Sequence, residues 1–455
     1  MDHPTNPMMI AVVLRFKGQI NYDRLITDLD VTLSRYRRFR QRIVRPREYF
    51  RRPYWEDDPT YRVEDHVERL NLQLPADETA VEEIVNRKMN TALDFGHPLW
   101  KLTLVDNHPD GSIILVRVHH CIADGISLMQ VLLQMTQPSP ELPVDQAAVN
   151  NPNRDGLQSS LESAIPKTMV QTFDRGEGTP AVSTTKPGEP TPKPDRSALS
   201  RNPTFIDMIA AIARIVFRPA DPPTILKGPL GQVKKAVWSE PFSVPEIKKI
   251  AQNKQATIND VLMAVAAGAI RRYMELHNDN RKRNIRAFIL VNLRGRSFDE
   301  ELGNKFGLVF LTLPIDREQP LERLEQIKRG MDSLKASAEY AATYLILNIL
   351  GQLPEWIEHL AVRILDRKGT VVATNVPGSR RQLYLADAPI QSTIGWVPQS
   401  GRIGVGLSFI SYNDQLEVGL NADAGLIPDP EKFIELFSEE YKSFQAVIPT
   451  DASLA

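Results

Sequence analysis

The chain has 455 residues, of which 42% are hydrophobic, and its formal net charge is −1. A chain of this length is too long for a single hydrophobic core and predicts two domains. The near-neutral charge argues against a nucleic-acid partner. Cys121 is the only cysteine, which excludes an intrachain disulfide and fits a reducing cytoplasm. No apolar run reaches the roughly 18 residues of a membrane-spanning helix, and no secretory signal is visible. We therefore expect a cytoplasmic protein that binds at most a membrane surface.

The first part of the chain predicts a strand, two helices and a hairpin. The strand covers 9–16, and the helices cover 21–38 and 82–89, where apolar residues recur at helical spacing. The region after the first helix is rich in arginine, which is most simply a solvated face, although it would also attract a polyphosphate or anionic lipid heads. Strands over 100–105 and 112–118 flank a turn-forming segment and predict the hairpin.

A compact group of polar residues follows this hairpin. Residues 119–125 read His-His-Cys-Ile-Ala-Asp-Gly, and an apolar-faced helix begins near Ile126. Imidazole suits proton transfer near neutral pH, because its unperturbed pKa is roughly 6.5. Gly125 would let the backbone turn tightly and leave space for a ligand. Asp124 could pair with a cation or orient a histidine.

Other interpretations of this segment stay open. The histidines could be structural, as single histidines usually are. A metal site is less favoured, because His119 and His120 are adjacent in a strand and point to opposite faces. A nucleophile pair of Cys121 with a histidine is also less favoured, because sequence neighbours rarely have the required geometry.

The middle of the chain changes character. Residues 137–202 are dominated by Pro, Ser, Thr, Gly and charged residues without a lasting apolar period, and they predict a linker. The next segment, 204–217, predicts an amphipathic helix that either docks on the second domain or lies on a lipid surface. The lipid interpretation predicts that replacing Ile215 and Phe217 with Asp releases the protein from liposomes.

The second half predicts strands and helices in mixed order. Thr257 suits an N-cap and Asp260 the first turn of a helix rich in small residues. An apolar region over 340–364, interrupted by Gly and Pro, predicts helix that belongs to the core or faces lipid, and 428–447 predicts a closing amphipathic helix. Residues 375–378, Asn-Val-Pro-Gly, predict a turn at a strand end. The predicted strands span 233–238, 286–293, 307–313, 370–373, 404–411 and 416–420.

The segment 119–125 matches the HHxxxDG signature of the CoA-dependent acyltransferase superfamily, and the chain as a whole resembles the bacterial wax ester synthase/diacylglycerol acyltransferase family. Four further motifs of this family occur in the same order, namely Pro4–Ile10, Pro98–Trp100, Asn259–Asp260 and Asn375–Gly378. One departure is that the family usually has a short segment before the first of these motifs, so a small N-terminal piece is expected to be absent.

The resemblance implies an α/β (α+β) fold of two lobes, each a mixed β-sheet flanked by helices, with the active site in a tunnel at their interface. The N-terminal lobe would cover 1–136 and carry the signature. A linker or crossover with the amphipathic helix would cover 137–222, and the C-terminal lobe would cover 223–455.

The resemblance also implies a role for each site residue. His120 would act as general base, and His119 and Gly125 complete the catalytic signature. Asp124 would hold the loop through Arg294, with Arg296 as the other candidate. The remaining implied site residues are Asn259 and Asp260 as structural support, Asn375 as oxyanion or substrate contact, and Pro98, Leu99 and Trp100 along the substrate tunnel or interface.

The implied reaction moves a long-chain acyl group from acyl-CoA to a fatty alcohol or to diacylglycerol, without a covalent intermediate, a cofactor or a metal. Acyl-CoA is a co-substrate, and the protein would associate peripherally with the inner membrane face or with lipid droplets. Two alternatives remain, a peptide-synthetase condensation-like domain and a non-catalytic lipid-binding relative. The absence of a carrier motif and the Pro-Thr-Asn-Pro-Met start favour the lipid family over the first alternative.

Overall fold

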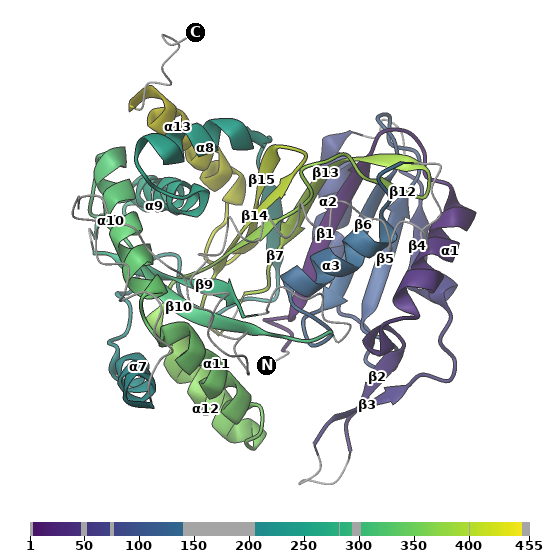
Figure 1. The fold of residues 1–455 in the computed structure, drawn as a ribbon, viewed down its shortest axis with the longest axis horizontal. Coiled ribbons are helices and arrows are strands. Elements are labelled where there is room, and N and C mark those ends of the chain that lie inside the picture. Colours follow the sequence, from purple (N-terminus) through teal and green to yellow (C-terminus); the bar gives the residue numbers. More distant parts are fainter. Residues whose placement is uncertain are drawn as a thin grey trace, which may run out of the picture.

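A computed structural model of the protein describes residues 3–46, 52–72, 77–139, 205–281, 283–293, 302–399 and 401–447. Two large mixed sheets stand side by side in it, with helices packed against each (Figure 1). This arrangement confirms the predicted α/β fold built on two mixed sheets flanked by helices. Most of the predicted linker, residues 140–204, lies outside the described residues.

The first sheet has six strands in the order β12-β13-β1-β6-β5-β4. From the N-terminal half it contains β1 (Met9–Phe16), β4 (Val67–Leu70), β5 (Trp100–Val105) and β6 (Ile113–His119). Strands β5 and β6 form the predicted antiparallel hairpin, and β6 also pairs with β1. One face packs on α1 (Tyr22–Leu33) and α3 (Gly125–Met135), the other on α2 (Glu78–Met89). Side chains alternate between the two faces, so Leu14 contacts the first pair of helices and Val13 the other helix.

The second sheet has the order β10-β9-β11-β14-β15-β7, with β8 paired to β15. Its strands are β7 (Lys234–Trp238), β8 (Phe242–Ser243), β9 (Ile285–Asn292), β10 (Phe306–Leu313), β11 (Val371–Pro377), β14 (Val405–Tyr412) and β15 (Gln415–Asp423). Strand β11 runs parallel to both of its neighbours, β9 and β14. The flanking helices are α8 (Val244–Asn253), α9 (Ile258–Leu276), α10 (Pro320–Lys335) and α13 (Pro430–Val447).

The start of α9 agrees with the prediction from the sequence. Thr257 is the N-cap residue, and its hydroxyl accepts a hydrogen bond from the Asp260 N–H at 3.2 Å. Asp260 Oδ2 in turn accepts from the Thr257 N–H at 2.8 Å, which completes a capping box. The middle of α9 is buried all round, as its small residues suggest.

Two strands from the second half of the chain join the first sheet. β12 (Tyr384–Leu385) pairs with β13 (Ala388–Trp396), and β13 pairs with β1. The boundary at residue 223 therefore does not separate the two sheets, and the predicted C-terminal lobe 223–455 also supplies an edge of the first sheet. Nothing in the sequence signalled this hairpin, because its turn at Ala386 and Asp387 has positive φ at both positions without the usual Asn or Gly.

Three helices gather at one end of the molecule, at the lower left of Figure 1. They are α7 (Phe205–Phe217), α11 (Glu339–Leu350) and α12 (Glu355–Leu365). The predicted interruption of the apolar region 340–364 separates α11 from α12. One face of α7 docks on the second half, where Ala211 and Ile215 are fully buried against Ala342 and Phe310. Ile215 is therefore a core residue. The prediction that replacing it with Asp would release the protein from liposomes was wrong, because the substitution would place a charge in the core.

The arginine-rich region forms a small hairpin of β2 (Gln41–Val44) and β3 (Tyr54–Asp57). Arg42 pairs with Glu56 at 3.0 Å, and the Arg38 guanidinium lies 4.3 Å from the centre of the Trp55 ring. Arg42 belongs to β2 and Arg38 to the turn just before it, and both contact side chains of β3. Among the helices of the described residues, none is long and apolar enough to cross a bilayer.

Candidate active site

The two histidines of the signature leave the end of β6 in opposite directions. Backbone hydrogen bonds hold both: the His119 N–H donates to Leu99 O at 2.9 Å, and the His120 N–H donates to Met8 O at 2.6 Å. His119 Nδ1 lies 2.9 Å from Cys121 Sγ, and its ring packs edge-on against Phe95. The His120 ring instead lines a cavity on the side of α3. The two rings therefore cannot share one metal ion, as strand alternation predicts.

His120 is an imidazole suited to accept a proton. Burial lowers the pKa of His120 below its ordinary value, because a charged ring would lose its hydration, while nearby Asp124 acts in the opposite direction. The ring lies 5.8 Å from the ring of Phe306, in an edge-to-face arrangement. An imidazole with a lowered pKa stays neutral near pH 7, which is the form that a general base requires.

Asp124 is the N-cap residue of α3. Its Oδ1 accepts a hydrogen bond from the Ser127 N–H at 2.9 Å, which satisfies one of the free N–H groups at the helix start. Its Oδ2 accepts from the Lys305 N–H at 3.0 Å, and Lys305 belongs to the second half of the chain. Arg294 and Arg296, the predicted partners of Asp124, lie outside the described residues, so that pairing stays a prediction.

A short segment of the second half, residues 304–306, covers the signature. Asn304 Nδ2 donates to His120 O at 2.9 Å, the Lys305 N–H donates to Asp124, and Phe306 packs against the His120 ring. Sequence reasoning missed this segment, since its contacts join residues about 180 positions apart in the chain and no motif marks them. The 304–306 segment thus fixes the signature against the second lobe.

An apolar cavity of about 130 Å³ lies between the first sheet with helices α1 and α3 on one side and strands β9, β11 and β14 of the second sheet on the other. His120 and Gly125 line it together with side chains that are almost all hydrophobic. Its lining includes Ile10, Val12, Leu14, Leu29, Leu33, Phe39, Trp100, Leu102, Val116, Val118, Met129, Leu132 and Met135. We call this space the apolar cavity.

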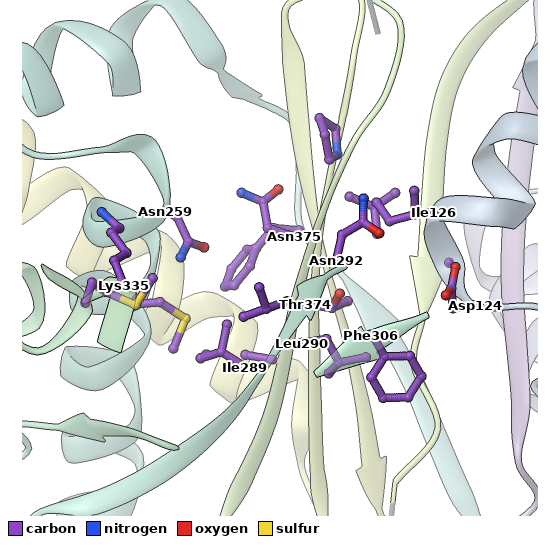
Figure 2. A pocket seen from close by; sticks show the side chains of 18 residues that line it. Asp124, Ile126, Asn259, Ile289, Leu290, Asn292, Phe306, Lys335, Thr374 and Asn375 are labelled. Atoms are coloured by element: carbon purple, nitrogen blue, oxygen red, sulfur yellow. The ribbon is translucent and has the colours of Figure 1, made fainter. Parts of the chain in front are cut away.

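A second cavity of about 120 Å³ lies between the signature and the second sheet. Asn259, Asn292 and Asn375 line it, and Figure 2 shows Lys335 at the end remote from Asp124. We call it the asparagine-lined cavity. The two cavities adjoin, because both are lined by Gly125, Leu290, Thr374 and Val376. Their junction lies beside the His-His-x-x-x-Asp-Gly signature.

Gly125 occupies this junction with an ordinary backbone conformation. It begins α3 and is not among the glycines with positive φ, so the expected tight glycine turn was wrong. A Cβ built there would meet Val376 Cγ2 at 3.5 Å, an ordinary contact distance. What the glycine contributes is open space, since it lines both cavities.

The other predicted site residues divide into lining and supporting residues. Asn375 lies within β11, two residues before its end, so the predicted turn begins later than expected, but its side chain does line the asparagine-lined cavity. Asn259 lines the same cavity, whereas Asp260 is buried in the capping box and lines neither cavity. The reasoning from the sequence missed Lys335, at the end of a helix that no motif announced.

The Pro98–Trp100 motif leads into β5. Trp100 lines the apolar cavity, and its indole N–H donates to Phe39 O at 2.9 Å. Leu99 is fully buried, and its carbonyl holds the His119 backbone. Pro98 is buried but lines neither cavity. The motif therefore forms one wall of the cavity and supports the first histidine.

Comparison with known proteins agrees with this arrangement. Residues 1–262 match the family described as wax ester synthase/diacylglycerol acyltransferase catalytic domain, and residues 302–445 match the WS/DGAT C-terminal domain. A Mycobacterium bovis protein named putative diacylglycerol O-acyltransferase is 25% identical over 83% of this chain and 78% of its own. The O-acyltransferase WSD of Acinetobacter baylyi is 23% identical over 87% of this chain and 84% of its own.

Solved structures share the fold. The wax ester synthase/diacylglycerol acyltransferase from Marinobacter aquaeolei superposes with a TM-score of 0.65 at 18% identity, over 98% of this chain and 96% of that one. A condensation domain of the calcium-dependent antibiotic synthetase gives a TM-score of 0.59 at 15% identity, over 96% and 92% of the two chains. At these identities the structural likeness concerns the fold alone.

Proposed function

The chain belongs to the wax ester synthase/diacylglycerol acyltransferase family and is an O-acyltransferase, and we propose that His120 is the general base with which it transfers a long-chain acyl group from acyl-CoA to a lipid hydroxyl. The acceptor is a fatty alcohol, which yields a wax ester, or diacylglycerol, which yields triacylglycerol. One observation supports this most: a half-buried imidazole with a lowered pKa lies where the apolar cavity adjoins the asparagine-lined cavity.

The reaction needs one proton carrier and no covalent enzyme intermediate. His120 takes the proton from the acceptor hydroxyl as its oxygen attacks the thioester carbonyl carbon. The carbon–sulfur bond then breaks, and the imidazolium returns the proton to the leaving CoA thiolate. The products are the oxygen ester and free CoA, and His120 is neutral again. A base of this kind contributes roughly a hundred- to ten-thousandfold to the rate.

The surrounding residues position this base and stabilise charge. Asp124 is a positioning residue. Its carboxylate accepts one hydrogen bond from an N–H group of each lobe and so fixes the loop that follows His120. Asn375 is our candidate for the oxyanion contact, because its amide lines the cavity beside the signature. Removing one such donor from an acyl-transfer site typically lowers kcat by about a hundred- to a thousandfold.

A competition assay tests the reaction. Hexadecanoyl-CoA is offered together with hexadecanol and dipalmitoylglycerol, and the lipid products are separated by chromatography. Formation of wax ester or triacylglycerol supports the proposal, and their ratio identifies the preferred acceptor. A carrier-bound hexadecanoyl thioester is the second donor. Transfer from the carrier alone would favour a condensation-like enzyme, and no product from any donor would favour a non-catalytic lipid-binding protein.

We also propose that the end of the molecule formed by α7, α11 and α12 rests on a lipid surface. Most of the exposed large hydrophobic side chains among the described residues lie there. On α7 they are Ile206, Ile209, Val216 and Phe217. On α11, on α12 and in the turn between them they are Leu345, Ile349, Leu353, Trp356, Leu360 and Ile364. Phe217 is 83% exposed and Trp356 is 65% exposed. Exposed arginines beside them, such as Arg214 and Arg363, suit anionic lipid heads.

Liposome sedimentation tests this surface. The variant Phe217→Asp with Trp356→Asp should remain folded and leave liposomes that contain anionic phospholipid, while activity on a short soluble alcohol survives. Leu276→Asp is the matched control, because this leucine is 53% exposed at the end of α9, away from the three helices. Undiminished binding of the double variant would contradict the proposed surface.

A further inference from the structure

We propose that Asn304 and Phe306 of the second lobe are positioning residues, which hold His120 in the orientation from which it takes the proton of the acceptor hydroxyl. The base therefore depends on a contact between the two lobes and not on the signature alone. This inference rests on the proposed general-base role of His120 and adds residues that none of the sequence motifs includes.

The backbone of His120 is held from both lobes. His120 lies one residue beyond the end of β6, and its N–H donates to Met8 O at 2.6 Å within the first lobe. The peptide that follows has the Cys121 N–H at one end, which donates to His119 Nδ1 at 3.2 Å. At its other end, His120 O accepts a hydrogen bond from Asn304 Nδ2 at 2.9 Å. The direction in which the His120 side chain leaves the backbone therefore depends on a donor that the second lobe supplies.

The ring of His120 is held by Phe306. The two rings pack edge-to-face, with centroids 5.8 Å apart and an angle of 64° between their planes, in the range that aromatic pairs prefer. Phe306 begins β10 and pairs with Asn292 of β9, so the second sheet fixes its position. Figure 2 shows Phe306 at the end of the asparagine-lined cavity nearer to Asp124. A rotation of the imidazole about its Cβ–Cγ bond changes this contact, and Phe306 therefore restricts where the reactive nitrogen points.

Lys305 ties these two contacts together. Its N–H donates to Asp124 Oδ2 at 3.0 Å, and its carbonyl accepts from the Leu293 N–H at 3.0 Å, just beyond the end of β9. Three consecutive residues thus contact the backbone of His120, the carboxylate of Asp124 and the ring of His120. A segment that is paired to a strand on one side and to the signature on the other has little freedom to move, as the precise placement of a catalytic group requires.

The side chain of Asn304 also affects the basicity of His120. Burial lowers the pKa of His120, whereas its own backbone carbonyl, the charge of Asp124 at the start of α3 and a hydrogen bond with the Asn304 side chain raise this pKa. Asn304 therefore stabilises the protonated ring that forms when the base accepts a proton. Removing the Asn304 side chain lowers the pKa of His120, and a carboxylate in its place raises it, since a negative charge favours the imidazolium.

Substitutions of Asn304 test the inference, with kcat, KM and the pH profile measured for the transfer of hexadecanoyl groups to hexadecanol. Asn304 is exposed, so Asn304→Ala and Asn304→Asp should fold, which circular dichroism checks. Neither an alanine nor a carboxylate can donate to His120 O. Both variants should lower kcat roughly tenfold or more with little change in KM, because a misplacement of about 1 Å can cost roughly a hundredfold. The acid limb of the kcat/KM profile should move to lower pH in Asn304→Ala and to higher pH in Asn304→Asp.

Substitutions of Phe306 test the contact with the ring. Phe306→Ala leaves the imidazole free to rotate and should lower kcat by a similar factor. Phe306→Leu keeps an apolar contact with the imidazole and should retain most of the activity that Phe306→Ala loses.

Asn90→Ala is the matched control. Asn90 is an exposed asparagine at the end of α2, on the face of the first sheet opposite to α3. It joins the two lobes through two hydrogen bonds with the backbone of Lys234, both 2.7 Å long. Its variant loses a contact between the lobes but none at the signature, so kcat and the acid limb should stay at their wild-type values.

A wild-type kcat in folded Asn304→Ala would overturn the inference. An equal loss in Asn90→Ala would also overturn it, because any weakened contact between the lobes would then slow the enzyme. The same holds for an unmoved acid limb in both Asn304 variants, which would mean a merely structural role. A His120→Ala enzyme that works at the wild-type rate would instead refute the proposed general base itself.

Discussion

Glu417 makes the stability of the protein depend on pH. This carboxyl lies on β15 and is 7% exposed, at a cavity where the two lobes meet on the side of Arg15. Burial raises the pKa of Glu417 to about 7, and the carboxylates of Glu240 and Glu78 add to the effect, whereas Ser392 and Arg15 oppose it. The folded protein therefore prefers the protonated form, while the unfolded chain ionises with the ordinary pKa of 4.5.

The free energy follows from these two values. Below pH 4.5 the group is protonated in both states and costs nothing, and stability is lost as the pH rises from 4.5 to about 7. At 1.36 kcal/mol per pKa unit, the loss above pH 7 is about 3 kcal/mol. Replacing Glu417 with Gln removes the ionisation and keeps the shape of the side chain.

Urea unfolding of the wild type and of Glu417→Gln at pH 5 and pH 8 measures this difference. The variant should be more stable than the wild type by about 3 kcal/mol at pH 8, and by much less at pH 5. An equal difference at both pH values would refute the reasoning, because it would mean that Glu417 does not change its ionisation in this range.

Three further predictions concern the site. Asp124→Ala removes the cap of α3 and the acceptor of the Lys305 N–H, so urea unfolding should show a loss of about 2 kcal/mol, and an unchanged midpoint would contradict this role. Because burial lowers the pKa of His120, the acid limb of the kcat/KM profile should lie below pH 6.5, whereas a limb above 6.5 would exclude His120 as its source. Asn375→Ala should lower kcat roughly a hundredfold at an unchanged melting temperature, and an unaltered kcat would remove Asn375 from the oxyanion site.

Local patterns predicted the elements that carry the site. Strand β1 and strand β5 begin and end as predicted, because local patterns determine them: a nearly continuous apolar run in β1, and apolar residues alternating with Lys101 and Thr103 in β5. The opposite directions of His119 and His120 follow from strand alternation alone. The cap at Thr257 was predictable for the same reason, since its partner is three residues away.

Contacts between distant parts of the chain were not predictable in this way. β13 joins the first sheet by pairing with β1, almost the length of the chain away. The 304–306 segment and Lys335 reach the site only through the packing of the second lobe. Ile215 and Phe217 looked alike in an amphipathic helix, yet packing against α11 buries the first and leaves the second exposed. The shape of both cavities depends on such tertiary contacts.

The most direct test of the proton-transfer role compares His120→Ala with His97→Ala in the transfer of hexadecanoyl groups to hexadecanol. His97 is an exposed residue paired with Asp58, so its variant controls for the loss of an imidazole elsewhere. The account predicts that His120→Ala folds normally and loses at least roughly a hundredfold in kcat, while His97→Ala keeps the wild-type rate. A folded His120→Ala protein that transfers acyl groups at the wild-type rate would contradict it.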